Sequence, residues 1–176
     1  MTLLTVITPT YRRPIGLAFN QATIAAQHQA ARIEHLIMVD EVGAGIPAMY
    51  RRLREIHPSG EWVFLLPDDD CLIHPDICDV IDQCAFTGAD VIMVGAYVNG
   101  ASLPWSQCWQ APPQMGGVTI TNWIVRRAVF ESIPYGERYE GDFDFITEVW
   151  RRGLSIAWAA IILTAQQRGA NFGRPE

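Results

Sequence analysis

Residues 64–76 read FLLPDDDCLIHPD, so a short apolar run meets three consecutive aspartates just before a predicted helix. Adjacent carboxylates repel one another, and packing alone gives a fold no reason to place three together. The trio formed by Asp68, Asp69 and Asp70 therefore indicates a bound cation or another polar ligand. The alternative is that the trio caps the helix that we expect Pro75 to open. A cap, however, needs one carboxylate rather than three.

The composition limits the class of protein. The chain has 176 residues, of which 49% are apolar, and a net charge of −6, which is typical of one globular domain. We find no basic footprint for nucleic acid. All thirteen positive charges are arginines, which excludes chemistry that depends on lysine. The four cysteines form no C-x-x-C pair, which favours free thiols in a reducing, cytoplasmic location.

Neither a leader nor a membrane anchor is expected. The N-terminus lacks the basic start and long apolar run of a signal peptide. The longest apolar stretch, 156–165, is about half the length of a membrane span. We therefore expect no transmembrane segment.

Short apolar runs alternate with helical patterns along the chain, which predicts an α/β domain with a mostly parallel sheet covered on both faces. The expected strands are 3–8, 33–40, 61–66, 89–98 and 154–163. The expected helices are 14–29, 47–57, 75–86, 128–133 and 141–153. Between them, 99–123 is rich in Pro, Gly and Trp without a clear period. We expect this segment to be a long functional loop.

Polar clusters follow the first three expected strands: TPTYRR, VDE and PDDD. In such sheets ligands bind at the carboxyl ends of the strands, so these clusters are expected to face one cleft. Aspartate oxygens suit Mg²⁺ or Mn²⁺, and a cation that bridges a diphosphate needs one or two protein carboxylates. Because alternate strand residues point the same way, Asp68 and Asp70 are expected to act together.

Four segments in this order resemble family 2 glycosyltransferases: TVITPTYRRP, VDE, VFLLPDDDCLIHPD and GDFDFITEVWRRG. The resemblance covers roughly residues 3–160 and implies a GT-A fold, a Rossmann-like three-layer α/β/α arrangement with a mostly parallel central sheet. It also implies transfer of a sugar from a nucleotide diphosphate donor, a UDP-sugar, with inversion and with help from Mn²⁺ or Mg²⁺. The single domain 1–176 would then hold a nucleotide-binding half, 1–98, and an acceptor and catalytic half, 99–176.

The resemblance also assigns residues. The nucleotide pocket would be lined by Thr8, Pro9, Thr10 and Tyr11, and Asp40 would meet the base or ribose. The D-x-D pair and metal ligands would be Asp68 and Asp70, with Asp70 touching the metal and Asp69 joining the donor site. Asp142 would be the general base for the acceptor hydroxyl. Turn or capping roles are the alternatives for Tyr11, Asp40 and Asp142.

Some features depart from the family pattern. Gly141 stands where many members have glutamate, and near the end of the chain Gln166 or Gln167 stands in the region where many have a metal-binding histidine. Asp142 and Asp144 are two residues apart at a helix start, so only one of them is expected to face the cleft.

Two other functions stay open: a non-catalytic binder of nucleotide sugars, and a nucleotidyltransferase, although we find no Gly-rich loop with Arg and Lys after the first strand. The acceptor is unidentified. A homo-oligomer or a partner chain would be able to complete its site. The tryptophans Trp105, Trp109 and Trp123 are candidates for sugar stacking or for core packing.

Overall fold

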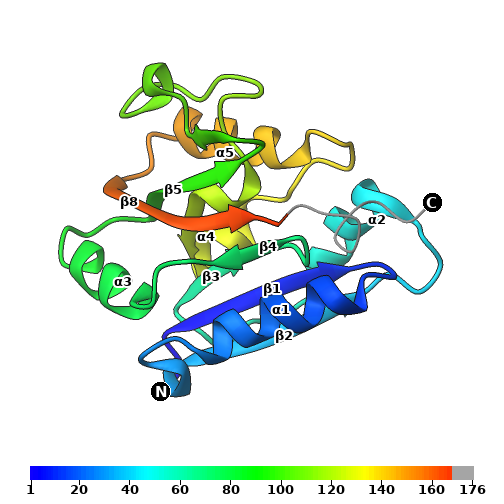
Figure 1. Ribbon diagram of the computed structural model, residues 1–176. Helices are drawn as coiled ribbons and strands as arrows, with labels where there is room; N and C mark the ends of the chain where they lie inside the picture. The colour runs from blue at the N-terminus through cyan, green and yellow to red at the C-terminus, as the bar shows by residue number, and fades with distance from the viewer. Residues whose placement is uncertain (168–176) are drawn as a thin grey trace.

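One eight-stranded sheet runs through the computed structural model, which describes residues 1–167. The strands lie in the order β2-β1-β3-β7-β5-β8-β4, and β6 pairs with β5 (Figure 1). Their bounds are β1 Leu4–Thr10, β2 Ile33–Val39, β3 Trp62–Leu65, β4 Asp70–Leu72, β5 Val91–Val98, β6 Ala101–Leu103, β7 Trp123–Arg126 and β8 Ile156–Gln166.

The sheet is mixed, but most of its strands share one direction. β1 is parallel to β2 and β3, and β5 is parallel to β8. β7 is antiparallel to both β3 and β5, so these two groups of strands run the same way. The opposite direction is taken by β4, β6 and β7. The predicted mostly parallel sheet is confirmed, with short antiparallel strands added to it.

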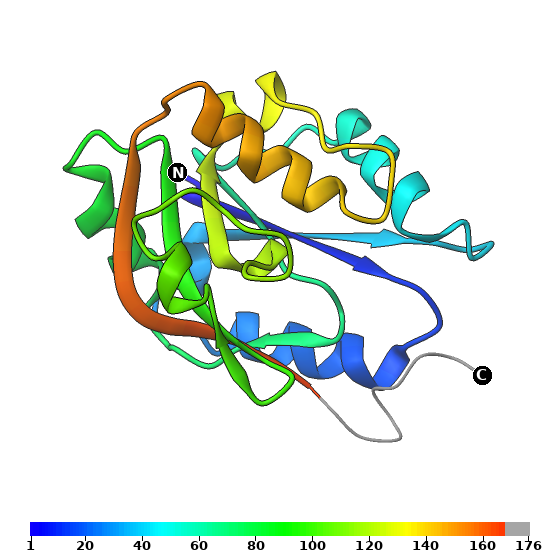
Figure 2. The same cartoon turned by 90° about the horizontal axis from the view of Figure 1, so that it is seen from above.

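Helices cover both faces of the sheet, which confirms the three-layer arrangement (Figure 2). One face carries α1 Pro14–Ala25 and α3 Ile77–Ala85. The other carries α2 Gly45–Arg52, α4 Arg127–Ser132 and α5 Gly141–Arg151. Short 3₁₀ turns occupy Ala30–Arg32, Leu53–Glu55, Ser106–Cys108 and Ile120–Asn122. Within 1–167, no helix has both the length and the apolar character to cross a bilayer.

The core explains why β3 reads as an unbroken apolar run. Trp62 and Phe64 pack into the core under α1 and α3, whereas Val63 and Leu65 pack into the core under α2, α4 and α5. All four side chains are at most 2% exposed. A central strand covered on both sides has no solvent face and therefore no polar alternation.

Several expected bounds were wrong. α1 ends at Ala25 rather than near residue 29, and α2 spans Gly45–Arg52 rather than 47–57. Pro75 does not open α3, which begins at Ile77. Three strands were missed, because β4, β6 and β7 are each at most four residues long. Such short runs carry too few residues for a period to stand out.

Candidate functional site

The ends of the first three strands lie beside one another, as the sequence predicts. The Asp40 amide donates to the Thr10 carbonyl at 2.8 Å, which joins the segment after β2 to β1. The Asp68 amide donates to the Pro9 carbonyl at 3.3 Å, which joins the segment after β3 to β1. The three polar clusters therefore meet at one edge of the sheet.

The aspartate trio forms a turn rather than a continuation of β3. The Asp70 amide donates to the Pro67 carbonyl at 2.9 Å, and β4 begins at Asp70. Asn20 of α1 holds this turn, since its Nδ2 donates to the carbonyls of Pro67 at 3.1 Å and Asp70 at 2.9 Å. Strand alternation therefore does not apply to Asp68 and Asp70, because a turn joins them.

Asp68 faces β1 and the start of α1. It is 3% exposed. One carboxylate oxygen accepts from Thr10 Oγ1 at 2.6 Å, and the other accepts from Arg13 Nη1 at 3.0 Å. The same Arg13 nitrogen lies 3.1 Å from Asp69 Oδ2. Burial raises the pKa of Asp68, although the bonds from Thr10 and Arg13 act against this shift.

Asp70 has a different environment. It is 6% exposed, and no group within residues 1–167 donates a hydrogen bond to its carboxyl oxygens. Burial, and then the charges of Asp69 and Asp68, raise the pKa of Asp70 to about 8. A carboxyl group in this state gains strongly from a cation placed beside it.

The donor groups around Asp70 fit a hard divalent cation. The Gln167 amide donates to the Asp69 carbonyl at 2.7 Å, which brings the end of β8 to the trio. The Gln167 side chain has its nitrogen and oxygen buried without a hydrogen-bond partner in the described chain. No group of three His, Cys, Asp or Glu side chains in 1–167 is arranged to hold a metal by itself. A cation here would share Asp70 with water and phosphate oxygens, as Mg²⁺ commonly does.

Asp40 organises the loop between β2 and α2. Its Oδ1 accepts from the amides of Gly43 at 2.9 Å and Ala44 at 3.0 Å, and more weakly from Val42 at 3.3 Å. Its Oδ2 accepts from Gly45 at 3.0 Å. The hydrogen bond from the Gly45 amide contributes most to lowering the pKa of Asp40. The carboxylate is therefore already committed to four backbone amides.

Tyr11 lies against this same loop. Gly43 has a φ of +74°, and a Cβ there would lie 2.7 Å from the Tyr11 hydroxyl oxygen. The Arg12 guanidinium lies over the Tyr11 ring at 5.0 Å from its centroid. Thr8, by contrast, is fully buried, with its Oγ1 3.2 Å from Asn20 Oδ1. Tyr11 is thus partly exposed at the edge of the candidate site, whereas Thr8 lies buried beneath that edge.

The two aspartates of α5 have opposite surroundings. Asp144 forms an ion pair with Arg138, whose Nε donates to Asp144 Oδ2 at 2.6 Å, and this bond lowers the pKa of Asp144. No arginine contributes to the shift in the pKa of Asp142. Burial raises the pKa of Asp142, and its Oδ1 accepts from the Phe143 amide at 2.8 Å. Of the two, Asp142 is the carboxyl group with the higher proton affinity.

Gly141 is required by packing. A Cβ there would lie 2.0 Å from the Gly136 carbonyl oxygen and 2.7 Å from Tyr50 Cδ2. The Gly136 amide also donates to the Gly141 carbonyl at 3.3 Å. The space that a glutamate side chain would need is filled by the chain itself, so the departure from the family pattern at Gly141 has a steric cause.

The segment before α5 is held by ion pairs and stacked rings. Arg51 Nε donates to Glu137 Oε2 at 3.0 Å, and Arg54 Nη1 lies 3.3 Å from Glu137 Oε1. Tyr135 stacks on Tyr50 with 5.3 Å between ring centroids and on Phe145 of α5 with 4.3 Å. These contacts fix the first turn of α5 against α2.

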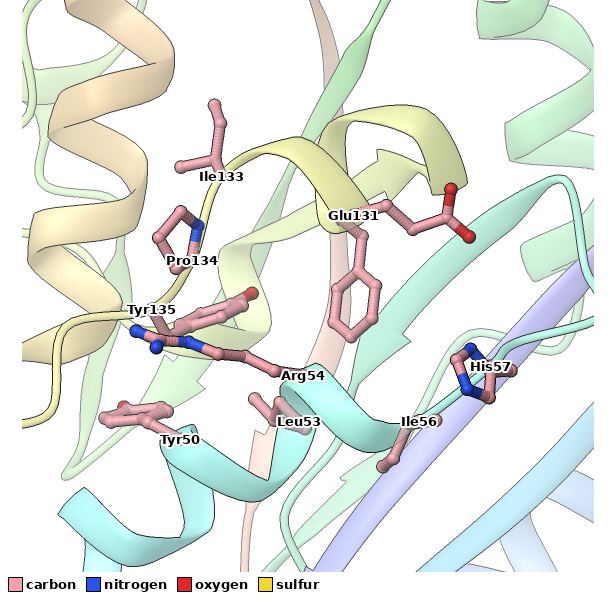
Figure 3. A pocket seen from close by; sticks show the side chains of 10 residues that line it. Tyr50, Leu53, Arg54, Ile56, His57, Glu131, Ile133, Pro134 and Tyr135 are labelled. Atoms are coloured by element: carbon pink, nitrogen blue, oxygen red, sulfur yellow. The ribbon is translucent and has the colours of Figure 1, made fainter.

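A hollow of about 530 Å³ lies on the other side of these rings, between the end of α2 and α4 (Figure 3). Tyr50 and Tyr135 form part of its wall, and Arg54, His57 and Glu131 stand at its polar positions. None of the three aspartates after β3 lines this hollow. It is thus separate from the strand-end site.

The three candidate tryptophans divide by burial. Trp123 is 2% exposed and packs in the core, and Trp109 lies edge-on to Trp158 with 5.0 Å between ring centroids. Trp105 is 40% exposed. Of these three, only Trp105 presents a large free surface for stacking.

Sequence reasoning missed two site residues, Arg13 and Asn20. Arg13 is part of the polar TPTYRR cluster, and a search for a cation to balance three aspartates would have pointed to it. Asn20 gives no comparable signal, because a lone polar residue in a helix pattern says nothing of the turn that it holds.

No family model and no curated protein matches the chain. Solved structures do resemble it. S. aureus TarS 1-349 in complex with UDP has a TM-score of 0.72 at 15% identity, over 96% of this chain and 61% of that one. The mannosyltransferase PcManGT from Pyrobaculum calidifontis, in complex with GDP-Man and Mn²⁺, has a TM-score of 0.69 at 12% identity, over 95% and 57%.

A third similar structure is glucosyl-3-phosphoglycerate synthase from Mycobacterium tuberculosis, in complex with Mg²⁺ and UDP. Its TM-score is 0.62 at 15% identity, over 96% of this chain and 72% of that one. The chain spans 37% of the longer TarS structure that it also matches. The fold of the chain is the GT-A fold that these glycosyltransferases share.

Proposed function

We propose that this chain is a glycosyltransferase that moves a sugar from a nucleotide diphosphate donor, a UDP-sugar, to an acceptor hydroxyl with inversion. One observation carries the proposal. In a GT-A fold, the ends of β1, β2 and β3 meet at one edge of the sheet, and the turn after β3 carries the buried carboxyl group of Asp70, which has no hydrogen-bond partner within 1–167. That is the edge of an α/β sheet where ligands bind.

The donor site is divided between its two ends. Tyr11 and the loop organised by Asp40 frame the nucleoside end, with Pro9 and Thr10 beside them. The diphosphate end faces Asp68, Asp69 and Asp70. Mn²⁺ or Mg²⁺ held by Asp70, with Gln167 nearby, would neutralise charge on the diphosphate as it leaves. The UDP and GDP-Man complexes of the similar structures support a nucleotide as the ligand of this fold.

Asp142 takes the acceptor proton in this mechanism. The acceptor oxygen attacks the anomeric carbon while its proton passes to the Asp142 carboxylate. The bond from the anomeric carbon to the phosphate oxygen breaks, and the electron pair leaves with the nucleoside diphosphate. Asp144 is less suited to this role, because its carboxylate is bound by Arg138 and holds a proton less readily.

A thermal-shift panel tests the proposal. Because a ligand that binds the native state stabilises it, UDP with Mn²⁺ at a hundredfold excess over Kd should raise the Tm by roughly 5–10 °C. UDP with EDTA should raise it less. Asp70→Asn should remove the metal-dependent part, and Asp82→Asn on α3 serves as the control. If no nucleoside diphosphate shifts the Tm with either metal, the proposal is contradicted.

Turnover of the donor separates an enzyme from a non-catalytic binder. A purified chain that binds UDP-sugars should release UDP in the presence of an acceptor pool. Binding without release under any of these conditions would favour the binder.

A further inference from the structure

Arg13 already supplies a cation to the aspartate trio. Its Nη1 donates to Asp68 Oδ1 at 3.0 Å and lies 3.1 Å from Asp69 Oδ2. Its side chain is 20% exposed, and that of Asp68 is 4% exposed. The ion pair is thus largely shielded from water. Charges in such a partly buried place attract one another more strongly than charges at the surface.

This arrangement divides the trio. Asp68 has both oxygens engaged, by Thr10 and Arg13, and Asp69 shares the guanidinium. Asp70 is 6% exposed and receives no hydrogen bond on its carboxyl group from the described residues. A divalent cation that binds at Asp70 must therefore enter beside a positive charge that is already in place.

The guanidinium also suits the diphosphate. Its planar set of donors pairs with phosphate as well as with carboxylate. Arg13 directly precedes Pro14, the first residue of α1, so its backbone is held at the start of this helix. Three methylene groups separate the guanidinium from that backbone. Phosphate oxygens beside Asp70 would offer Arg13 a new partner when the cation takes over the carboxylates.

We propose that Arg13 is the resting counter-cation of the trio and also a donor-binding residue. Its charge competes with that of a divalent cation at Asp70 for the negative charge of the trio, and it then donates to the diphosphate of the donor. This inference rests on the proposed function and adds a residue that controls how the site exchanges one positive charge for another.

The test uses Mn²⁺ alone and UDP as separate probes on the full chain at one pH. Arg13→Gln keeps a hydrogen-bond donor near Asp68 and removes the charge. Without nucleotide, this variant should bind Mn²⁺ about tenfold more tightly, measured from the electron paramagnetic resonance of free Mn²⁺, because a competing charge is gone. At saturating Mn²⁺ it should bind UDP about tenfold more weakly by calorimetry, because a charge-assisted bond is lost.

Two further variants complete the test. Arg13→Lys keeps the charge and loses the planar fork, so Mn²⁺ affinity should stay as in the wild type while UDP affinity falls. Arg32→Gln removes an arginine that pairs with Asp82, near the start of β2 and away from the trio, and should change neither affinity. If Arg13→Gln does not fold, Arg13→Lys becomes the deciding variant. Affinities of Arg13→Lys for Mn²⁺ and UDP that both equal those of the wild type would overturn the inference.

The outcomes separate the inference from the proposed function. Shifts of Mn²⁺ and UDP affinity in the same direction in Arg13→Gln, or no shift in either, would overturn the role of Arg13 while leaving a binding-competent wild type. A wild-type chain that binds neither Mn²⁺ nor UDP would contradict the proposed function and the inference together.

Discussion

Asp142 and Asp144 stand two positions apart on α5, yet only Asp144 is neutralised by an arginine. If Asp142 is the base, Asp142→Asn should lower transfer by roughly 10²–10⁴-fold, the usual loss for a missing general base. Donor affinity should survive, because the residues proposed to bind the nucleotide lie on other elements. Asp144→Asn is the matched control and should be much milder. A dead Asp144→Asn beside an active Asp142→Asn would reverse the assignment.

The pH dependence of transfer follows from the same residue. A base must be deprotonated to accept the acceptor proton, so the rate falls as the pH drops through its pKa. Burial raises the pKa of Asp142, which moves this acidic limb above the value of about 3.9 for a free aspartate. The charge of Asp144 contributes to the same shift. A pH profile of kcat/KM should therefore move to lower pH in Asp144→Asn. A limb that stays fixed would contradict this electrostatic account.

Asp40 has a structural role in its loop, and the proposed function gives it a binding role as well. Asp40→Ala leaves four loop amides without their acceptor, so we expect unfolding to become easier by about 1 kcal/mol, as for a lost helix cap. UDP affinity should fall even in EDTA, because the loop lies against Tyr11. Asp40→Asn keeps one acceptor oxygen and should lose less stability. Calorimetry and chemical denaturation measure both effects. Unchanged UDP affinity in Asp40→Ala would leave Asp40 a loop anchor alone.

At the scale of elements, the first turn of α5 is fixed by close packing. Gly141→Ala would force a Cβ onto the Gly136 carbonyl and the Tyr50 ring, which should cost about 1–3 kcal/mol of stability. Thr147→Ala changes an exposed position of the same helix and should stay within about 0.5 kcal/mol. Denaturation midpoints compare the two variants. Equal stability of Gly141→Ala and Thr147→Ala would show that this turn tolerates a side chain.

The elements that sequence predicted well are those with a strong apolar signal. β1, β3 and β5 are buried on both faces, so their runs of apolar residues mark them plainly. β7 was missed because its four residues are too few to show a period. Asn122 secures its start through bonds to the carbonyls of Val94 at 2.9 Å and Leu103 at 3.0 Å. Such long-range bonds leave no local pattern in the sequence.

The candidate site, too, could be predicted from the sequence only in part. Strand-end clusters predicted that the segments around Asp40 and Asp68 meet, because parallel strands bring their carboxyl ends to one edge. The inner geometry of the trio could not be predicted in this way. A turn from Pro67 to Asp70 stands where strand alternation was expected for Asp68 and Asp70, and Arg13 pairs with Asp68 and Asp69. Side-chain pairing across 55 residues of sequence depends on the fold as a whole.

At the scale of the whole molecule, the sheet brings the end of β8 to the trio after β3. Asp70 pairs in register with Gln166, and Gln167 donates its amide to the Asp69 carbonyl. The two halves of the sequence thus share one sheet and one strand-end site. A nucleotide bound there would contact segments that lie more than a hundred residues apart in the chain, as ligands of α/β sheets commonly do.

The central claim is that Asp70 makes nucleotide binding depend on a divalent cation. Calorimetric titration of UDP into the purified chain, with Mn²⁺ and then with EDTA, tests it most directly. We expect at least about tenfold tighter binding with Mn²⁺, a difference of about 1.4 kcal/mol, and nearly equal affinities in the two buffers for Asp70→Asn. Equal UDP affinity with and without Mn²⁺ in the wild-type chain would contradict the account.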